Sequence, residues 1–347
     1  MTPEGPLREL LEHSLQIPEG DDLALLSAVG LDLPGAIEII KSDQSFNFEI
    51  NSNTDYQDIG IVEKMEPVFR FSLAGVQMKF SVLKENDRLT IPVKGQLGEW
   101  IVKQDSLRFP KLVENEFATL EWARNAGFNV PECQILPADS LPPELKANTP
   151  PGSNVFLIRR YDRQQGKRIH QEDFAQVVNL RPSLKYDQIT YESCAKLVLA
   201  ICGVEGYNEF IRRLVFMVAT GNTDAHLKNW SLLYPDGITA ELTPLYDQVV
   251  TIAWPLEKPY VWQWALKFAG TKNLYSIDET SFVRLVERSG GNVKETISIV
   301  RETLESIANS WSTSNAPGLM PNEFKEALLR HWKKVPLLKN LASLIEL

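Results

Sequence analysis

The sequence is poor in the features that mark secreted, membrane-spanning and zinc-binding proteins. Its 347 residues include three cysteines, Cys133, Cys194 and Cys202, and no two of them form a C-x-x-C pair. This odd number argues against both a disulfide framework and a structural zinc site. No run of about 18 uninterrupted apolar residues occurs, and charged residues interrupt the leucines near the N-terminus. We therefore expect neither a membrane span nor a signal peptide. The expected location of the protein is the reducing cytoplasm.

An excess of positive charge is also absent. With 36 lysines and arginines against 45 aspartates and glutamates, the formal net charge is -9, so no direct binding to nucleic acid is expected. A hydrophobic fraction of 44%, a charged fraction of 23% and the lack of low-complexity tracts are typical of a globular chain. A chain of this length can bury a large core, and we expect it to form two lobes.

Residues 1–66 predict a small N-terminal subdomain followed by a linker. Leucines recur at helical spacing over residues 6–16, and a second helical run covers Leu23–Val29. Residues Ala36–Ile40 have the composition of a strand. Two helices and one strand would bury little surface by themselves, so we expect another part to complete the subdomain. Residues 42–66 are polar and lack periodicity, which predicts a linker or long loop.

Residues 67–163 predict a strand-rich lobe. Short alternating runs indicate an antiparallel sheet with strands at Val68–Ser72, Lys79–Leu83, Leu89–Val93 and Trp100–Lys103. A helix is expected over residues 113–127, where apolar positions recur at helical period and a glycine ends the run. Two further strands are expected at 129–136 and 155–163, with a proline-rich loop between them.

Residues 164–347 predict a mainly helical lobe. Residues 170–173 are expected to begin a short helix, and a hairpin with a Pro-Asp-Gly turn is expected at 230–238. Longer runs at helical period cover residues 191–202, 207–220, 282–286, 293–308 and 323–332. The expected fold class is therefore α+β, with a strand-rich N-lobe that precedes a mainly helical C-lobe.

The segment 221–230 carries the motif on which the functional interpretation rests. Asp224 precedes Asn229 by five residues in a polar loop. This is the spacing of a protein-kinase catalytic loop, in which the aspartate orients the attacking hydroxyl and the asparagine holds magnesium. Asp247 follows a further apolar run, where a kinase requires its second metal ligand. The same spacing also occurs in ordinary turns, where both side chains cap backbone amides.

Two upstream features fit a nucleotide-binding lobe. In the loop Ser72–Lys79, small residues at Ala74 and Gly75 would let the backbone approach an anionic group. Lys103 ends an apolar strand, as does the lysine that kinases place on nucleotide phosphates. An ordinary hairpin turn and a surface lysine are the alternatives. One of the glutamates on the following helix could pair with Lys103, and the candidates are Glu114, Glu116 and Glu121.

The strand that ends near Arg159 and Tyr161 could form a hinge. In a two-lobed kinase, the strand that enters the hinge presents backbone groups to adenine, which would place these residues beside the base. A plain core strand with a charged exit explains the same pattern.

Several short blocks, in one order, resemble the HipA-type serine/threonine kinase toxins of bacterial toxin–antitoxin systems. The blocks are Ser72-Leu-Ala-Gly-x-Gln-x-Lys79, Ile101-Val-Lys103, Glu114-Asn-Glu116, Arg160-Tyr-Asp-Arg163, His170-Gln-Glu-Asp173, Lys185-Tyr186, Gly221-Asn-x-Asp-x-His-x-Lys-Asn229 and Pro244-x-Tyr-Asp247. The resemblance runs from about residue 22 to the C-terminus. It implies a protein-kinase-like fold, the use of ATP and magnesium, and protein substrates that include aminoacyl-tRNA synthetases, whose phosphorylation halts translation.

The resemblance also implies a role for each motif residue. Asp224 would be catalytic, Asn229 and Asp247 would hold magnesium, and Ser72 would be autophosphorylated, after which its loop leaves the nucleotide site. The expected nucleotide contacts are Ser72, Ala74, Gly75, Val76, Gln77, Lys79, Lys103, Arg159, Tyr161 and Lys228. His226 belongs to the motif, but a structural hydrogen-bonding role is expected for it.

Partners follow from the same resemblance. The N-terminal subdomain is shorter than is usual in the family, as in the tripartite systems in which a separate small protein supplies the missing piece. The double arginine Arg159-Arg160 is shared with those short toxins. We expect such a small partner and a DNA-binding antitoxin.

Two other functions remain open at this stage. A small-molecule kinase of the aminoglycoside-phosphotransferase type shares the spacing from Asp224 to Asn229, but it usually has a histidine where this chain has Asn222. The other alternative is a catalytically idle partner that only docks an antitoxin on DNA.

Overall fold

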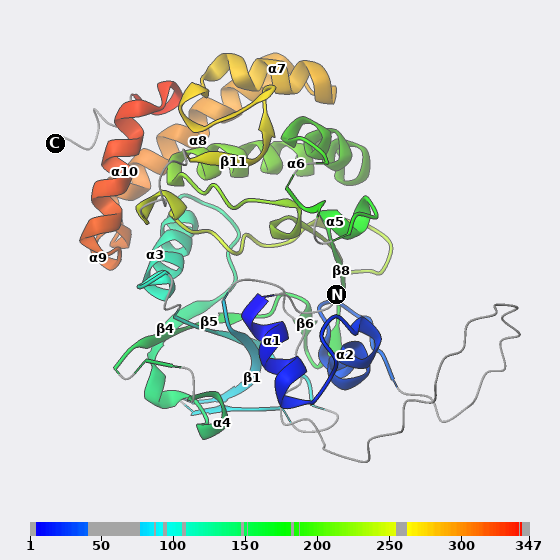
Figure 1. The fold of residues 1–347 in the computed structure, drawn as a ribbon. Helices are drawn as coiled ribbons and strands as arrows, with labels where there is room; N and C mark the ends of the chain where they lie inside the picture. The colour runs from blue at the N-terminus through cyan, green and yellow to red at the C-terminus, as the bar shows by residue number, and fades with distance from the viewer. Residues whose placement is uncertain are drawn as a thin grey trace, which may run out of the picture.

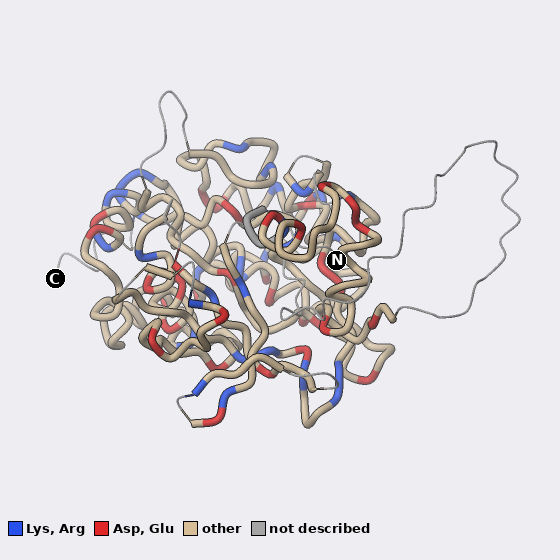
Figure 2. Tube along the Cα trace, turned by 60° about the horizontal axis from the view of Figure 1, so that its bottom comes forward, with Lys and Arg blue, Asp and Glu red and all other residues tan. Residues whose placement is uncertain are grey.

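The computed structural model shows two lobes, one stacked on the other (Figure 1). It describes residues 5–40, 77–86, 88–92, 96–105, 109–146, 149–150, 152–181, 184–186, 188–254, 262–339 and 341. The linker expected at 42–66 and the strand expected at Val68–Ser72 lie outside these residues. Within the described ranges, no helix combines the length and the apolar character that a membrane crossing demands. Acidic and basic residues are interspersed along the trace (Figure 2).

A five-stranded antiparallel sheet forms the N-lobe. The strand order is β2-β1-β3-β5-β4. The strands are β1 (Lys79–Glu85), β2 (Arg88–Thr90), β3 (Trp100–Gln104), β4 (Cys133–Pro137) and β5 (Asn154–Arg159). Side chains alternate between the two faces of a strand, and on β5 Val155 and Leu157 join one core cluster while Phe156 and Ile158 join another. Both faces of the sheet are therefore covered.

The N-terminal helices cover one face of this sheet (Figure 1). Helices α1 (Gly5–Ser14) and α2 (Asp22–Val29) lead into the 3-10 helix η1 (Gly30–Asp32). Fully buried Leu11, Leu25 and Val29 share a cluster with Phe80 and Val82 of β1, together with Leu145 of the short helix α4 (Pro143–Lys146). The N-terminal subdomain thus buries its apolar face against the N-lobe, although Leu23 and Ile40 stay 74% and 70% exposed.

The strand expected at Ala36–Ile40 is wrong. The structure has no strand in this segment, because the N–H of Ile39 turns back to the carbonyl oxygen of Gly30 at 2.9 Å instead of pairing in a ladder. β-Branched composition favours a strand only where a neighbouring strand supplies the partner groups.

The C-lobe is mainly helical, as expected. Its central helix, α6 (Tyr191–Thr220), joins the two helices expected at 191–202 and 207–220 across a kink at Gly203, where φ is 69°. The other helices are α5 (Phe174–Val177), α7 (Glu279–Ser289), α8 (Val293–Thr313), α9 (Ala316–Leu319) and α10 (Asn322–Lys334). Asp278 and Asn292 accept hydrogen bonds from first-turn amides of α7 and α8, which explains where these two helices begin.

Short strands complete the C-lobe and its junction with the N-lobe. They are β6 (Arg163–Gln164), β7 (Lys167–Arg168), β8 (His170–Asp173), β9 (Ser231–Tyr234), β10 (Glu241–Leu242), β11 (Gln263–Phe268) and β12 (Thr271–Asn273). The helix expected to begin at residues 170–173 is wrong, because these residues pair with β9 as β8. Asp173 then caps the following helix α5 by accepting from Gln176 N, so the polar block marks the strand-to-helix junction.

Helix α3 (Leu112–Asn125) belongs to the cores of both lobes. Its Val113 and Leu120 pack with Phe156 of β5. Its Trp122 lies in the C-lobe core, with its ring 4.6 Å from that of Trp311 and 5.9 Å from that of Trp332. The indole N–H of Trp122 also donates to the carbonyl oxygen of Ile307. The position of the N-lobe over the C-lobe therefore depends on this helix.

We predict that Trp122→Ala destabilises the protein by about 3–5 kcal/mol, because it removes a large side chain from a close-packed aromatic cluster and leaves a cavity. Urea unfolding followed by circular dichroism measures the change. Asn125→Ala, on the exposed side of the same helix, is the matched control and should change the free energy of unfolding by less than about 1 kcal/mol. Equal effects of the two substitutions would contradict the proposed role of α3.

Candidate active site

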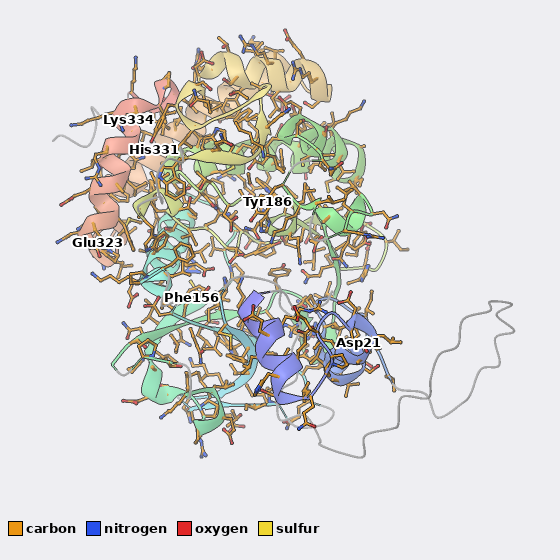
Figure 3. The ribbon with its side chains drawn as sticks, in the orientation of Figure 1. Asp21, Phe156, Tyr186, Glu323, His331 and Lys334 are labelled. Carbon is orange, nitrogen blue, oxygen red and sulfur yellow. The ribbon has the colours of Figure 1, made fainter. Side chains whose placement is uncertain are left out.

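A cavity of about 460 Å³ lies where the two lobes meet. The N-lobe and α3 contribute Lys79, Lys103 and Glu116 to its lining, and the C-lobe contributes Asp224, Asn229 and Asp247. This volume is in the range of pockets that bind small organic ligands. Figure 3 labels Phe156 in the N-lobe and Tyr186 in the C-lobe, on either side of this junction.

Two lysines reach the cavity because of strand register. Lys79 on β1 and Lys103 on β3 are direct partners across the antiparallel pair, and directly opposed residues present their side chains on the same face of a sheet. Both ammonium groups contact the carboxylate of Asp247, at 2.7 Å from Lys103 and 3.2 Å from Lys79. One carboxylate of the C-lobe thus binds two cations of the N-lobe.

The helix phase of α3 selects the glutamate that pairs with Lys103. Val113, Glu116 and Leu120 lie on one face of the helix, and the two apolar members anchor that face on the sheet. Glu116 is therefore brought to 2.5 Å from the ammonium of Lys103. The other two candidates point elsewhere, since Glu114 accepts from Asn154 and Glu121 pairs with Arg124.

These four charges strongly shift one another's ionisation. Burial alone would lower the pKa of Lys103, but the carboxylates of Asp247 and Glu116 outweigh it and raise that pKa above its ordinary value. Burial alone would raise the pKa of Asp247, but Lys103 and Lys79 lower it far below its usual range. Burial lowers the pKa of Lys79 and raises that of Glu116. Asp247 and Lys103 therefore remain charged near neutral pH.

The loop that carries Asp224 is fixed at its base by a glycine. Helix α6 ends at Gly221 with φ of 61°, a left-handed conformation that favours glycine, and a Cβ there would lie 2.6 Å from Ile252 Cδ1. The hydroxyl of Thr251 donates to the carbonyl oxygen of Gly221 at 2.8 Å, and Asn222 donates to Gln248. The segment after Asp247 therefore ties down the loop before Asp224.

Asp224 is held from three sides. Its N–H donates to Asn222 Oδ1 at 3.1 Å, its carbonyl oxygen accepts from Asn229 Nδ2 at 2.8 Å, and its carboxylate Oδ1 accepts from the hydroxyl of Tyr186 at 2.8 Å. Its side chain reaches solvent at the cavity, yet desolvation by the surrounding protein raises its pKa, which the Tyr186 hydrogen bond opposes. Among the described residues, the hydrogen bond from Tyr186 is made to Oδ1, and none is made to the second carboxylate oxygen.

His226 is a buried residue of the loop, but the hydrogen bond expected for its ring is not seen among the described residues, where Nδ1 is buried without a partner. It is buried, and its burial lowers the pKa of the imidazole to about 3, so the ring is neutral. The ring of Tyr186 meets it edge to face at 5.0 Å, and the N–H of Asn229 donates to the carbonyl oxygen of His226. His226 therefore supports both Tyr186 and the turn that carries Asn229.

The donor set fits a magnesium ion. The amide nitrogen of Asn229 is used in its bond to the carbonyl oxygen of Asp224, so its amide oxygen and the carboxylate of Asp247, both in the cavity lining, could hold the ion. No group of three or more His, Cys, Asp or Glu side chains in the described residues could enclose a metal ion. One carboxylate and one amide oxygen, with phosphates and water for the other positions, is a usual magnesium arrangement.

The other predicted nucleotide contacts are distributed unequally. Tyr161 and Arg159 both line the cavity. The ring of Tyr161 lies 5.7 Å from that of Tyr246, and the side chain of Arg159 is 54% exposed and 3.6 Å from Glu132. Gln77 is buried and donates to the carbonyl oxygen of Gln104 at 2.7 Å. Lys228 is half-buried in the cavity lining. The remaining predicted contacts lie outside the described residues and are Ser72, Ala74, Gly75 and Val76.

Sequence reasoning missed Tyr186 and Tyr246 as members of the site. Tyr186 stands in the Lys185-Tyr186 block that supported the resemblance, but its contact with Asp224 joins residues 38 positions apart. Tyr246 directly precedes Asp247, and its hydroxyl bonds to Ser231 and to the carbonyl oxygen of Lys228. Tyr246 is itself a member of the Pro244-x-Tyr-Asp247 block, and that membership was the available signal.

Comparisons with known proteins agree with this geometry. The chain is 34% identical to "Putative kinase Y4dM" of Sinorhizobium fredii over 99% of this chain and 82% of that protein. It is 25% identical to "Serine/threonine-protein kinase toxin HipA" of Shewanella oneidensis over 72% of this chain and 61% of that protein. A solved structure of HipA with HipB and operator DNA from Shewanella oneidensis matches with a TM-score of 0.73 at 20% identity, over 99% of this chain and 85% of that one.

The protein-kinase-like, two-lobed α+β fold predicted from the sequence is confirmed by this structural match. A family model described as the HipA-like C-terminal domain matches residues 71–311, and one described as the HipA N-terminal domain matches residues 1–40. The protein is therefore a member of the HipA family of kinase toxins.

Proposed function

We propose that the protein is an ATP-dependent serine/threonine protein kinase that acts as the toxin of a toxin–antitoxin system. One observation carries the proposal. Lys103 is bonded both to Glu116 and to Asp247, while Asp224 lines the same cavity with its carboxylate oriented by Tyr186. In this proposal they would serve as the lysine–glutamate pair, the metal-binding aspartate and the catalytic aspartate that protein kinases use for phosphoryl transfer.

Lys103 and Lys79 would bind the phosphates of ATP. Both ammonium groups now contact the carboxylate of Asp247, so they are already gathered at one point before a ligand arrives. Preorganised charges of this kind stabilise a transferring phosphoryl group without reorganisation. Magnesium held by Asp247 and Asn229 would supply further positive charge against the phosphate oxygens.

Asp224 would act on the acceptor hydroxyl. The hydroxyl oxygen forms a new bond to the γ-phosphorus, the bond from that phosphorus to the oxygen of ADP breaks, and the carboxylate of Asp224 takes the hydroxyl proton. The raised pKa of Asp224 favours this proton acceptance. Tyr161 and the backbone near Arg159 would hold adenine, and the Ser72–Lys79 loop would cover the phosphates. Gln77 would contribute to nucleotide binding from the N-lobe, and Lys228 would contribute from the C-lobe.

Toxicity would follow from phosphorylation of a protein needed for translation, such as an aminoacyl-tRNA synthetase, in the cytoplasm. The Shewanella oneidensis relative was solved with HipB and operator DNA, which supports a DNA-binding antitoxin as a partner here. A small protein that adds to the short N-terminal subdomain is the second proposed partner, and the exposed side chains of Leu23 and Ile40 are available to it. Autophosphorylation at Ser72 would switch the kinase off, because a phosphoserine carries about -1.5 to -2 charges and repels nucleotide phosphates.

Labelled ATP added with a cell lysate tests the proposed function. We expect the label to enter a protein band, and acid hydrolysis of that band to release phosphoserine or phosphothreonine. Label found only in a small molecule would favour the aminoglycoside-phosphotransferase type of activity instead. Absence of any transfer would favour the catalytically idle partner.

Asp224→Asn should lower the rate of phosphoryl transfer by about 10²–10⁴-fold and leave nucleotide affinity nearly unchanged, because the proton acceptor is lost while the phosphate contacts remain. Steady-state kinetics and calorimetric titration with ADP and magnesium measure the two quantities. Peptide mapping of the substituted protein should find no phosphate on Ser72. Asp236→Asn makes the same chemical change on the exposed turn after β9 and serves as the control. A normal transfer rate in Asp224→Asn would show that the catalytic loop is wrongly assigned.

Tyr186→Phe should lower kcat by about 10-fold with little change in KM for ATP, because a hydrogen bond to a charged group is lost. This bond favours the ionised form of Asp224 and opposes its raised pKa, so its removal raises the pKa further. The acidic limb of the pH–rate profile should therefore move to higher pH.

Tyr234→Phe is the control for this substitution, because its hydroxyl bonds to Glu172 away from the cavity. An unchanged acidic limb in Tyr186→Phe would contradict the assignment of Tyr186 as a positioning residue.

A further inference from the structure

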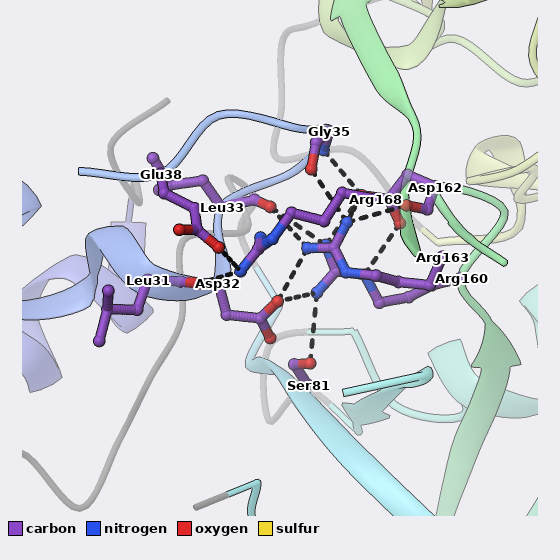
Figure 4. Close-up of polar contacts among 10 residues, drawn as sticks. All are labelled: Leu31, Asp32, Leu33, Gly35, Glu38, Ser81, Arg160, Asp162, Arg163 and Arg168. Carbon is purple, nitrogen blue, oxygen red and sulfur yellow. Dashed lines mark hydrogen bonds and ion pairs between the residues drawn. The ribbon is translucent and has the colours of Figure 1, made fainter. Parts of the chain in front are cut away.

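Four charged side chains form a buried cluster where the N-terminal subdomain meets the chain that leaves β5 (Figure 4). They are Asp32, Arg160, Asp162 and Arg163, and each side chain is between 1% and 5% exposed. We refer to this cluster as the clamp. Asp32 Oδ1 accepts from Arg160 at 3.0 Å and from Arg163 at 2.8 Å. Asp162 Oδ2 accepts from the same two arginines at 2.8 and 2.9 Å.

The clamp joins three parts of the chain that are far apart in sequence. From the N-terminal subdomain, the carbonyl oxygen of Leu33 accepts from both arginines, and the N–H of Gly35 donates to Asp162 at 2.7 Å. From β1, the hydroxyl of Ser81 bonds to Arg160 at 3.3 Å. The double arginine and the aspartates thus fasten residues 32–35 to the hinge and to the strand that carries Lys79.

Gly35 shows how closely the N-terminal segment approaches the hinge region. Its φ is 79°, and a Cβ there would lie 2.9 Å from the backbone nitrogen of Gln171. Both features require glycine at this position. The backbone of the N-terminal segment therefore lies directly against β8 and the clamp.

The clamp is also part of the cavity wall. Pro34, Arg160, Tyr161 and Asp162 all line the cavity. Pro34 stands between Leu33 and Gly35, whose backbone groups the clamp holds. On β1, Ser81 and Lys79 are two residues apart and so lie on the same face of the strand. Displacement of residues 32–35 would therefore change the cavity at the hinge and release one support of β1.

The clamp is nearly complete but keeps spare hydrogen-bonding capacity. Two positive and two negative side chains balance in charge. Even so, within the described part of the chain, Asp32 Oδ2 and Arg163 Nε are buried without a hydrogen-bond partner. Unsatisfied buried polar atoms penalise the closed arrangement and so reduce the free-energy difference between a closed and an open clamp.

We propose that the N-terminal subdomain is a working part of the nucleotide site, and that the clamp makes nucleotide affinity depend on how residues 32–35 are held. This inference rests on the proposed function, since it assigns nucleotide to the cavity. A closed clamp positions Pro34 and the hinge for binding, and an open clamp leaves the wall incomplete. By linkage, bound nucleotide must in turn stabilise the closed clamp. A protein that binds the N-terminal subdomain would thereby change nucleotide affinity without touching the cavity.

Asp32→Asn tests the inference, because it removes the charge that the N-terminal segment contributes to the clamp. The dissociation constant for ADP with magnesium, measured by calorimetry, should rise about 10-fold, while kcat at saturating ATP should stay within about 2-fold. A loss of stability alone would give a different result, because it lowers the folded fraction and therefore the apparent kcat, but it does not change the affinity of the folded molecules for ADP. Glu38→Gln, which breaks the outer ion pair with Arg168 at 2.7 Å, is the matched control and should leave affinity unchanged.

A milder variant and a direct probe keep the test decisive if Asp32→Asn does not fold. Ser81→Ala removes one contact of Arg160 and leaves every charge paired, so we expect a smaller rise of about 2–3-fold in the dissociation constant. In the unsubstituted protein, ADP with magnesium should slow hydrogen exchange of the Gly35 amide, which donates to Asp162.

Two outcomes would overturn the inference. One is unchanged affinity in the folded clamp variants, and the other is exchange at Gly35 that does not respond to bound nucleotide. If the unsubstituted protein fails to bind ADP with magnesium at all, the proposed function fails, and the clamp loses its assigned ligand with it.

Discussion

The ammonium group of Lys103 is the point on which the arrangement of this protein depends. A buried cation is unfavourable unless carboxylates surround it, and removal of one partner from such a pair costs about 3–5 kcal/mol. Glu116 approaches it at 2.5 Å from α3 and Asp247 at 2.7 Å from the C-lobe. Strand β3, helix α3 and the segment around Asp247 must therefore meet in one arrangement. The aromatic contacts of Trp122 on the same helix hold that arrangement in the C-lobe core.

The charges that fasten the lobes are also the charges that the proposed reaction uses. Lys103 and Lys79 are gathered on Asp247, and Asp224 lines the same cavity with its carboxylate oriented by Tyr186. Structural support and chemistry therefore coincide, as expected of a preorganised electrostatic site. The side of the cavity near Arg160 is built differently, because its wall includes Pro34 of the N-terminal subdomain. Asp32 of the same subdomain forms buried ion pairs with Arg160 and Arg163.

Local patterns predicted much of the fold and part of the site. The spacing from Asp224 to Asn229 placed two cavity residues, but helix phase and packing had to choose Glu116 from three glutamates. The strand at 36–40 was wrong because composition does not show whether a partner strand exists, and residues 170–173 became a strand because β9 lies beside them. Contacts between distant positions, such as Tyr186 with Asp224, leave no periodic signal. The autophosphorylation of Ser72 stays a prediction, since that residue lies outside the described ranges.

The central claim is that Lys103 and Asp247 act as one phosphate-binding unit, and a double-mutant cycle tests it most directly. The dissociation constant for ADP with magnesium is measured for Lys103→Met, for Asp247→Asn and for the double variant, with folding checked by circular dichroism. Each single substitution should weaken binding by about 10-fold or more. The double variant should bind little worse than the single variant with the lower affinity, because the effects of substituting directly contacting residues are not additive. Full affinity in Lys103→Met, or strictly additive effects in the double variant, would contradict the account.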